Sequence, residues 1–211
     1  LIGASTTIGE YFIPGIIGTF QSSYPDVRIR LHVANTNGII HMVENNVVDI
    51  GIVEGPVNNK NLVKEVIWND ELVTICPVGH PLSGRKKVAI GEVLEHPFIS
   101  REEGSGTREV VENYLSKRKV DSDNVDIIME FGSPESIKSA VTAGLGVSIL
   151  SVATIEKELA LGSLAAIPLS PPIRRTFSIV NQRQKFRLRA MEEFLEFARE
   201  HCANRRPPAP S

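Results

Sequence analysis

The amino-acid sequence predicts an α/β fold built from two Rossmann-like lobes joined by a hinge that the chain crosses twice. Strand-like and helix-like apolar patterns alternate along almost the whole chain, which favours a sheet rich in parallel strands. Two turns rich in hydroxyl side chains and glycine, residues 4–9 and 103–108, each follow a short apolar run and precede a helical pattern. Ligands in such folds bind at the carboxyl ends of the strands, so both turns are expected to face one cleft.

Two linker-like stretches set the predicted division of the chain. Both contain proline, at residues 79–87 and at residues 169–173. Two such linkers indicate that one lobe is inserted into the other. We therefore expect lobe I to comprise residues 1–81 and 172–205, lobe II to comprise 82–171, and a disordered tail to follow at 206–211.

Apolar periodicity predicts the elements of lobe I in order. A helical stripe runs from Ile8 to Phe20, and Pro14 should kink this helix or mark the start of its regular part. Strict alternation from Val27 to Val33 predicts a strand with one solvent-facing side. The remaining predicted elements are a short helix at 36–45, strands at 47–53, 72–78 and 176–181, and an amphipathic helix at 188–201.

The alternation of strands and helices continues in lobe II. Ser133-Pro134-Glu135 is a strong helix start, with serine at the N-cap, proline at the first position and an acid in the first turn. Gly144 suits the left-handed position that ends that helix. The other predicted elements are strands at 98–100, 127–131 and 147–150 and a helix at 107–119.

Composition excludes several classes of protein. The 211 residues are 42% hydrophobic and carry a net charge of −2, so a free-standing nucleic-acid binder, which is usually basic, is not expected. Cys76 and Cys202 lie far apart in the sequence, which argues against a disulfide scaffold or a zinc site and for a reducing cytosol. No apolar run approaches the roughly 20 residues of a membrane span. The chain begins inside a strand-like run without methionine, and we expect it to be a fragment.

The two hydroxyl-rich turns have the chemistry of an anion site. A helix that opens directly after a strand points several backbone N–H groups at one spot, and the helix dipole adds partial positive charge there. Serine and threonine hydroxyls add further donors, and this combination binds small anions. The other interpretation is plain helix capping, for which these residue types are also preferred.

Six segments, taken in order, resemble the effector-binding domain of LysR-type transcriptional regulators. The resemblance covers residues 1–198, and within the family it is greatest to the CysL-like subgroup, which is linked to sulfur assimilation. Those segments are residues 3–9, Tyr24-Pro25, 49–56, His80-Pro81-Leu82, 101–108 and 143–150.

The resemblance implies a periplasmic-binding-protein type 2 architecture and a role in transcription regulation in the cytoplasm. It implies a homodimer, or a tetramer in the full-length protein, with RNA polymerase among the partners open to that protein. DNA would be bound only through an N-terminal winged helix-turn-helix domain that is absent from this chain. The helix at 8–24 with the strand at 27–34 is the candidate dimer surface.

The resemblance also carries over a set of effector contacts. Ser5, Thr6 and Thr7 match the ligand turn of lobe I, and Ser105, Gly106 and Thr107 match that of lobe II. Binding would favour closed lobes by its differential affinity for them, and closure would alter the geometry of the dimer.

Four further residues complete the candidate site. Arg101 and Arg108 flank the lobe II turn, where an arginine can bind an anion bidentately, although Arg108 can instead point to solvent. Glu54 is expected to pair with Arg101 or another base across the cleft, to bind an ammonium group of an amino-acid-like effector, or to be a solvated carboxylate. Ser133 could line the cleft or simply cap its helix.

Other functional classes are weaker alternatives. A solute-binding protein of an anion transporter would use the same fold and site. No nucleophile with a matched base, paired-carboxylate site or phosphate-binding loop is evident, so neither an enzyme nor a cofactor is expected. The five histidines are scattered without metal-ligand spacing, so no metal is expected either.

Overall fold

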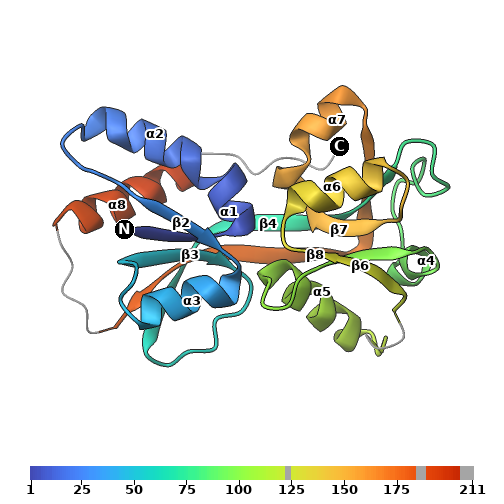
Figure 1. Cartoon of the computed structure of the whole chain (residues 1–211), viewed down its shortest axis with the longest axis horizontal. Coiled ribbons are helices and arrows are strands. Elements are labelled where there is room, and N and C mark those ends of the chain that lie inside the picture. The colour runs from blue at the N-terminus through green and yellow to red at the C-terminus, as the bar shows by residue number, and fades with distance from the viewer. Residues whose placement is uncertain (122–124, 184–188, 205–211) are drawn as a thin grey trace. The chain divides into compact units, whose positions relative to one another are not determined.

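The structure is a computed structural model that describes residues 1–121, 125–183 and 189–204 (Figure 1). The predicted tail at 206–211 and the predicted helix start at Leu188 lie outside these residues. The described chain divides into two compact units. Among the described residues, unit 1 contains Leu1–Asn69 and those between 176 and 204, and unit 2 contains those of Asp70–Arg175.

The chain passes between the units inside two long strands, β4 (Leu62–Pro77) and β8 (Leu164–Gln182). The sequence placed these crossings in the proline-containing stretches near 79–87 and 169–173, and the structure places them elsewhere. Residues after β4 form consecutive turns, with His80 N bonded to Pro77 O at 3.1 Å and Ser83 N to His80 O at 2.8 Å. Linker-like composition marks irregular backbone at 79–87, but the other predicted linker, 169–173, lies within strand β8, and both crossings lie inside strands.

Unit 1 has the strand order β2-β1-β3-β8, in which β2 and β3 run parallel to β1 and β8 runs antiparallel to β3. Its shorter strands are β1 (Ile2–Ser5), β2 (Leu31–Ala34) and β3 (Ile50–Glu54). Its helices are α1 (Thr6–Tyr11), α2 (Ile13–Ser23), α3 (Thr36–Glu44) and α8 (Arg189–Asn204).

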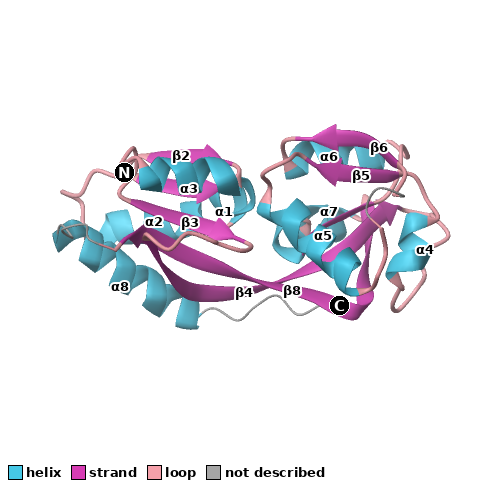
Figure 2. Cartoon of the chain, turned by 90° about the horizontal axis from the view of Figure 1, so that it is seen from below, coloured by secondary structure: helices cyan, strands magenta, loops and turns pink. Residues whose placement is uncertain are grey.

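Alternate residues of β3 face two different hydrophobic clusters. Ile50 and Ile52 pack with α1, α2 and α8, while Val53 packs with α3 on the opposite face of the sheet (Figures 1 and 2). Gly51 lies under α3, where a Cβ atom would come within 2.8 Å of Val180 Cγ2. The close approach of α3 to the sheet therefore requires glycine at this position.

Unit 2 also combines parallel strands with an antiparallel pair of strands. Strand β5 (Phe98–Arg101) is parallel to β6 (Ile127–Phe131), and β7 (Ser148–Ser151) is antiparallel to β4. Helices α4 (Ile90–Leu94) and α5 (Gly106–Lys117) belong to one hydrophobic cluster, and α6 (Pro134–Thr142) and α7 (Glu156–Leu161) to another. A single 3₁₀ turn, η2 (Val152–Thr154), connects β7 to α7.

Several predicted elements differ from those observed. The strands predicted at 72–78 and 176–181 correspond only to the C-terminal parts of the longer strands β4 and β8. The predicted helix along the Ile8–Phe20 stripe is two helices, α1 and α2, which meet at Phe12 because Pro14 lies in the first turn of α2. The predicted strand at 27–33 is a strand only from Leu31, where β2 pairs with β1. Among the described residues, no helix is both long and apolar enough to cross a membrane.

Candidate functional site

The turn between β5 and α5 presents a buried hydroxyl group that no other group in the described part of the chain binds. Gly104 has a φ of +82°, which lets the chain reverse before the helix. Ser105 then occupies the N-cap of α5, yet its side chain makes no capping hydrogen bond. The residue is 2% exposed, and its Oγ has no hydrogen-bond partner among the described residues. Helix capping therefore does not explain Ser105.

Arg101, the last residue of β5, brings a second uncommitted donor to this turn. Its Nε and Nη2 atoms bind the carboxylate of Glu102 at 2.8 and 3.0 Å, and Nη2 also approaches Gly132 O at 3.4 Å. The side chain is 2% exposed, and Nη1 has no partner among the described residues. A buried N–H group without an acceptor is costly, so this atom is suited to a ligand oxygen.

Thr107 is tied to a buried ion pair of unit 2. Arg175 Nη1 donates to Thr107 Oγ1 at 2.8 Å, and Arg175 Nε donates to Asp70 Oδ2 at 2.6 Å. Ser151 Oγ donates to the other oxygen of Asp70 at 2.7 Å. All four side chains are buried. The network fixes the first turn of α5 against both β4 and β8.

Arg108 is engaged by two carboxylates. Its Nε binds Glu112 at 2.7 Å and its Nη1 binds Glu130 at 2.5 Å. The hydrogen bond to Glu112 is the main reason that the pKa of Arg108 is raised above its ordinary value, with Glu130 adding to the shift. Two carboxylates thus hold Arg108, whereas Arg101 keeps Nη1 without a partner among the described residues, which makes Arg101 the better candidate for an anion ligand.

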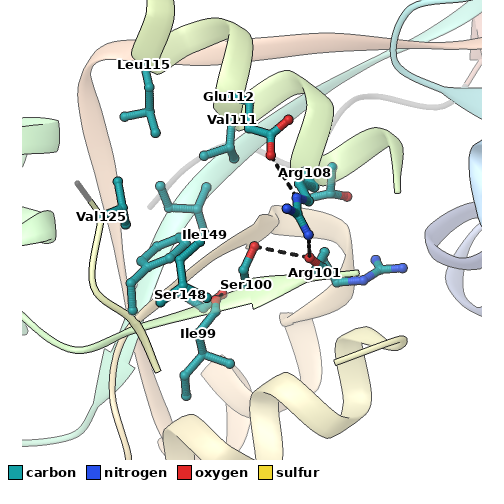
Figure 3. Close-up of a pocket in the computed structure, with 13 residues that line it drawn as sticks. Ile99, Ser100, Arg101, Arg108, Val111, Glu112, Leu115, Val125, Ser148 and Ile149 are labelled. Atoms are coloured by element: carbon teal, nitrogen blue, oxygen red, sulfur yellow. Dashed lines mark hydrogen bonds and ion pairs between the residues drawn. The ribbon is translucent and has the colours of Figure 1, made fainter. Parts of the chain in front are cut away.

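A cavity of about 270 Å³ lies beside this turn within unit 2 (Figure 3). In Figure 3, Arg108 reaches between Glu112 and the backbone of Arg101, and the Arg101 guanidinium points away from Leu115 and Val125. Aliphatic side chains from α5, β5 and β7 form the deeper wall. The cavity is therefore mainly apolar, with its charged groups along one side.

The turn between β1 and α1 differs from the α5 turn because a buried carboxylate, that of Glu54 at the end of β3, lies beside it. Ser5 Oγ donates to Glu54, and Thr36 Oγ1 donates to the backbone oxygen of the same glutamate at 3.1 Å. Glu54 is 1% exposed, so it is not the solvated loop carboxylate that was one of its alternatives. Thr6 Oγ1 binds Ala34 O at 3.3 Å, and Thr7 is buried beside it. An ion pair between Glu54 and Arg101 stays a prediction.

Ser133 caps helix α6, which is one of the two roles predicted for it from the sequence. Its Oγ accepts a hydrogen bond from Ser136 N at 3.2 Å at the start of α6. Its contact with an effector stays a prediction. Gly144, at the other end of α6, has the expected positive φ of +79°.

Sequence reasoning missed Asp70 and Arg175, although a signal for both was present. Residues two apart on a strand share a face, so Arg175 lies on the side that carries Ile173 and Phe177. By the same rule, Asp70 shares the apolar side of Trp68 and Leu72. Opposite charges on the buried faces of two strands predict an ion pair.

The histidines take no part in these turns. His80 and His96 are in edge-to-face contact at 4.5 Å, and burial, with a smaller effect of His96, lowers the pKa of His80. Within the described ranges, no three or more His, Cys, Asp or Glu side chains are grouped so that they could hold a metal ion.

Comparison with known proteins identifies the class of protein. The model of the LysR substrate-binding domain matches residues 1–203. The HTH-type transcriptional regulator YeiE of Escherichia coli is 38% identical over 198 residues, which are 93% of this chain and 66% of YeiE. A probable RuBisCO transcriptional regulator of Trichormus variabilis is 35% identical over 92% of this chain and 59% of its own length. The chain thus spans about two thirds or less of these two relatives.

A solved structure with the same fold extends the comparison. The regulatory domain of Synechocystis CcmR, in complex with 2-PG, superposes with a TM-score of 0.88 at 33% identity and covers 96% of both chains. The chain belongs to the LysR substrate-binding domain family, and it is the effector-binding domain of a LysR-type regulator. The predicted α/β fold of periplasmic-binding-protein type 2 is confirmed, and the family is not one of enzymes.

Proposed function

We propose that this domain senses a small anion through the turn between β5 and α5. The observation that carries the proposal is the pair of buried donors, Ser105 Oγ and Arg101 Nη1, which have no partner among the described residues. Ser105 is the N-cap of a 12-residue helix, where backbone N–H groups and the helix dipole favour negative charge, and Arg101 ends the strand that leads into the same turn. Gly106 permits close approach at the first helical position, and Thr107 supplies a further hydroxyl.

A second set of contacts is proposed at the turn after β1. Ser5, Thr6 and Thr7 lie there with Glu54, whose buried carboxylate accepts a hydrogen bond from Ser5 Oγ. A carboxylate favours a donor over an anion, so this set suits an ammonium or hydroxyl group of the effector. An effector with one anionic end and one donor end, as in an amino-acid derivative, would satisfy both sets.

Two chemical groups of anion are candidates for the effector. The resemblance to the CysL-like subgroup favours sulfur anions such as sulfate, sulfite and thiosulfate, or an acetylated serine. The relatives found include regulators named for RuBisCO and a CcmR domain in complex with 2-PG, which favour an organic phosphate. Both groups carry the terminal oxyanion that the α5 turn is suited to bind, and both therefore belong in one binding screen.

In the whole protein, the domain would couple effector binding to transcription. We propose that it forms a homodimer through α2 and the edge strand β2, and that DNA is bound by a separate N-terminal domain in the cytoplasm. Val33 in β2 is 45% exposed, which leaves apolar surface on this edge. Sedimentation velocity of the domain, with Val33→Lys as the disrupting variant, tests this surface, and a dimer unaffected by Val33→Lys would contradict it.

The anion-sensing function is tested by thermal unfolding. The panel comprises sulfate, sulfite, thiosulfate, phosphate, O-acetylserine and 2-phosphoglycolate, each compared with chloride at matched ionic strength. A ligand at 100 times its Kd stabilises the native state by about 2.7 kcal/mol. For a chain of this size, this corresponds to a rise in Tm of roughly 5–10 °C.

Two serine variants make the test specific. Ser105→Ala should abolish the rise in Tm, whereas Ser163→Ala, which removes a hydroxyl bonded to Glu158 O outside the proposed contacts, should preserve it. A selective rise that Ser105→Ala leaves unchanged would show that the anion binds elsewhere. No selective rise with any anion of the panel would refute the proposed ligand class.

A further inference from the structure

We propose that Arg175 is a positioning residue for effector binding, which fixes the Thr107 hydroxyl so that its proton is directed to an anion at the α5 turn. Asp70 in turn fixes Arg175. The inference rests on the proposed anion-binding function of this turn, and it assigns a role to two residues on the strands that connect the units.

The direction of the hydrogen bond follows from chemistry. A guanidinium group has only donors, so Thr107 Oγ1 must be the acceptor in its 2.8 Å contact with Arg175 Nη1. A hydroxyl group that accepts one hydrogen bond still has its proton to donate. Among the described residues, no acceptor binds this proton, so Thr107 is prepared as a donor for an oxygen atom of a ligand.

The orientation of Arg175 is set by its ion pair. Arg175 Nε and Asp70 Oδ2 are 2.6 Å apart, and both side chains are 1% exposed. Ser151 binds the second oxygen of Asp70 at 2.7 Å, so neither side chain can rotate without loss of a buried hydrogen bond. A fixed cation beside the Thr107 oxygen also polarises its O–H bond, which strengthens the hydroxyl as a donor.

Arg175 and Asp70 neutralise each other, so the effect of Arg175 on a ligand differs from that of an arginine without a carboxylate partner. Asp70 neutralises Arg175, and long-range attraction of an anion by this guanidinium is small. We assign the contribution of Arg175 to the single hydroxyl of Thr107, and a direct hydrogen bond from Arg175 Nη2 to the anion would appear as an additional loss in the double variant. Removal of that hydroxyl should make a change at Arg175 irrelevant to affinity.

Asp70 and Arg175 are the first and last residues of unit 2. They lie in β4 and β8, the two strands through which the chain passes between the units. A ligand bound to Thr107 would thus be connected by direct hydrogen bonds to both strands.

A double-mutant cycle tests the proposal. The dissociation constant for the panel anion that binds wild-type protein best is measured by isothermal titration calorimetry for Thr107→Val, Arg175→Lys and the double variant. Thr107→Val should weaken binding roughly 10-fold or more, because a hydrogen bond to a charged group is lost. Arg175→Lys keeps the charge but loses the planar fork, and we expect a loss of roughly 5-fold or more. The double variant should bind no more weakly than Thr107→Val alone.

Two controls separate positioning from general destabilisation. Tyr114→Phe removes the hydrogen bond from the Tyr114 hydroxyl in α5 to Pro171 O in β8 and leaves Asp70, Arg175 and Thr107 unchanged, so the Kd should stay within about 2-fold of wild type while Tm falls. Thr107→Ser restores the hydroxyl and should recover most of the affinity. If Arg175→Lys does not fold, as judged by circular dichroism, the isosteric Asp70→Asn takes its place in the cycle.

The outcomes distinguish a failure of the positioning role of Arg175 from a failure of the anion-binding function of the α5 turn. Losses that multiply in the double variant would show that Arg175 acts independently of Thr107 and would overturn the proposal. An equal loss of affinity in Tyr114→Phe would also overturn it, because it would indicate general loosening. Failure of wild-type protein to bind any anion of the panel would refute the anion-binding function, and the positioning role with it.

Discussion

Ser105 and Ser133 occupy equivalent positions at the starts of α5 and α6, yet loss of their hydroxyl groups should have opposite effects on stability. Ser133 Oγ accepts a backbone hydrogen bond from Ser136 at 3.2 Å. Ser133→Ala should therefore lower the free energy of unfolding by about 1 kcal/mol, as for other N-cap substitutions.

The structure predicts a different result for Ser105→Ala. Ser105 Oγ is buried without a partner among the described residues, and burial of an unsatisfied polar group costs about 1–3 kcal/mol. Alanine removes that penalty and forfeits no cap. We expect the unfolding free energy of the ligand-free domain to be unchanged or raised by up to about 1 kcal/mol.

Urea unfolding of both variants and the wild type, followed by circular dichroism in chloride buffer, measures these differences. The slope of free energy against urea concentration should stay constant, so that a change in midpoint reports stability alone. If Ser105→Ala lost about 1 kcal/mol, as a cap would, Ser105 would be a stabilising residue and its assignment to the effector would fail.

Two further predictions concern packing and thiol chemistry. Gly51→Ala should destabilise the domain by about 1–3 kcal/mol, because the new Cβ would lie 2.8 Å from Val180 Cγ2. Gly18→Ala in α2, where a Cβ meets nothing within 4 Å, should instead stabilise it by about 0.5–1 kcal/mol, and equal urea midpoints for the two variants would contradict the packing argument. Burial raises the pKa of Cys76 to about 11 from 9.0, so this thiol contributes stability that is fully present below pH 9 and is lost as pH rises above it. A thiol reagent at pH 8 should label Cys76 in a Cys202→Ser variant only after unfolding, and rapid labelling of the native protein would show that the thiol is accessible.

Most of the local structure could be predicted from the sequence because each element carries its own periodicity and its own stop signals. The strand predicted at 127–131 matches β6, and the helix start at Ser133-Pro134 matches α6. Pro14 correctly marked the start of the regular helix α2. The turns after β1 and β5 were also identified, since hydroxyl residues and glycine between a strand and a helix have few other uses.

The crossings between units could not be predicted in this way. Proline and glycine reveal where the backbone is irregular, and they identified the turns after β4 well. A strand that leaves one unit and enters another keeps its hydrogen bonds and its alternation of faces, so its sequence carries no mark at residues 69/70 or 175/176.

The sequence by itself determined the α/β fold, the succession of strands and helices, and the two turns that define the candidate site. Only the tertiary structure decided what each polar side chain in those turns does. Ser105 and Ser133 look alike in sequence, but one is an unpartnered buried group and the other a cap. Arg175 and Asp70 lie 105 positions apart: strand periodicity marks each as a charge on a buried face, but only the packing of the whole unit brings the two together.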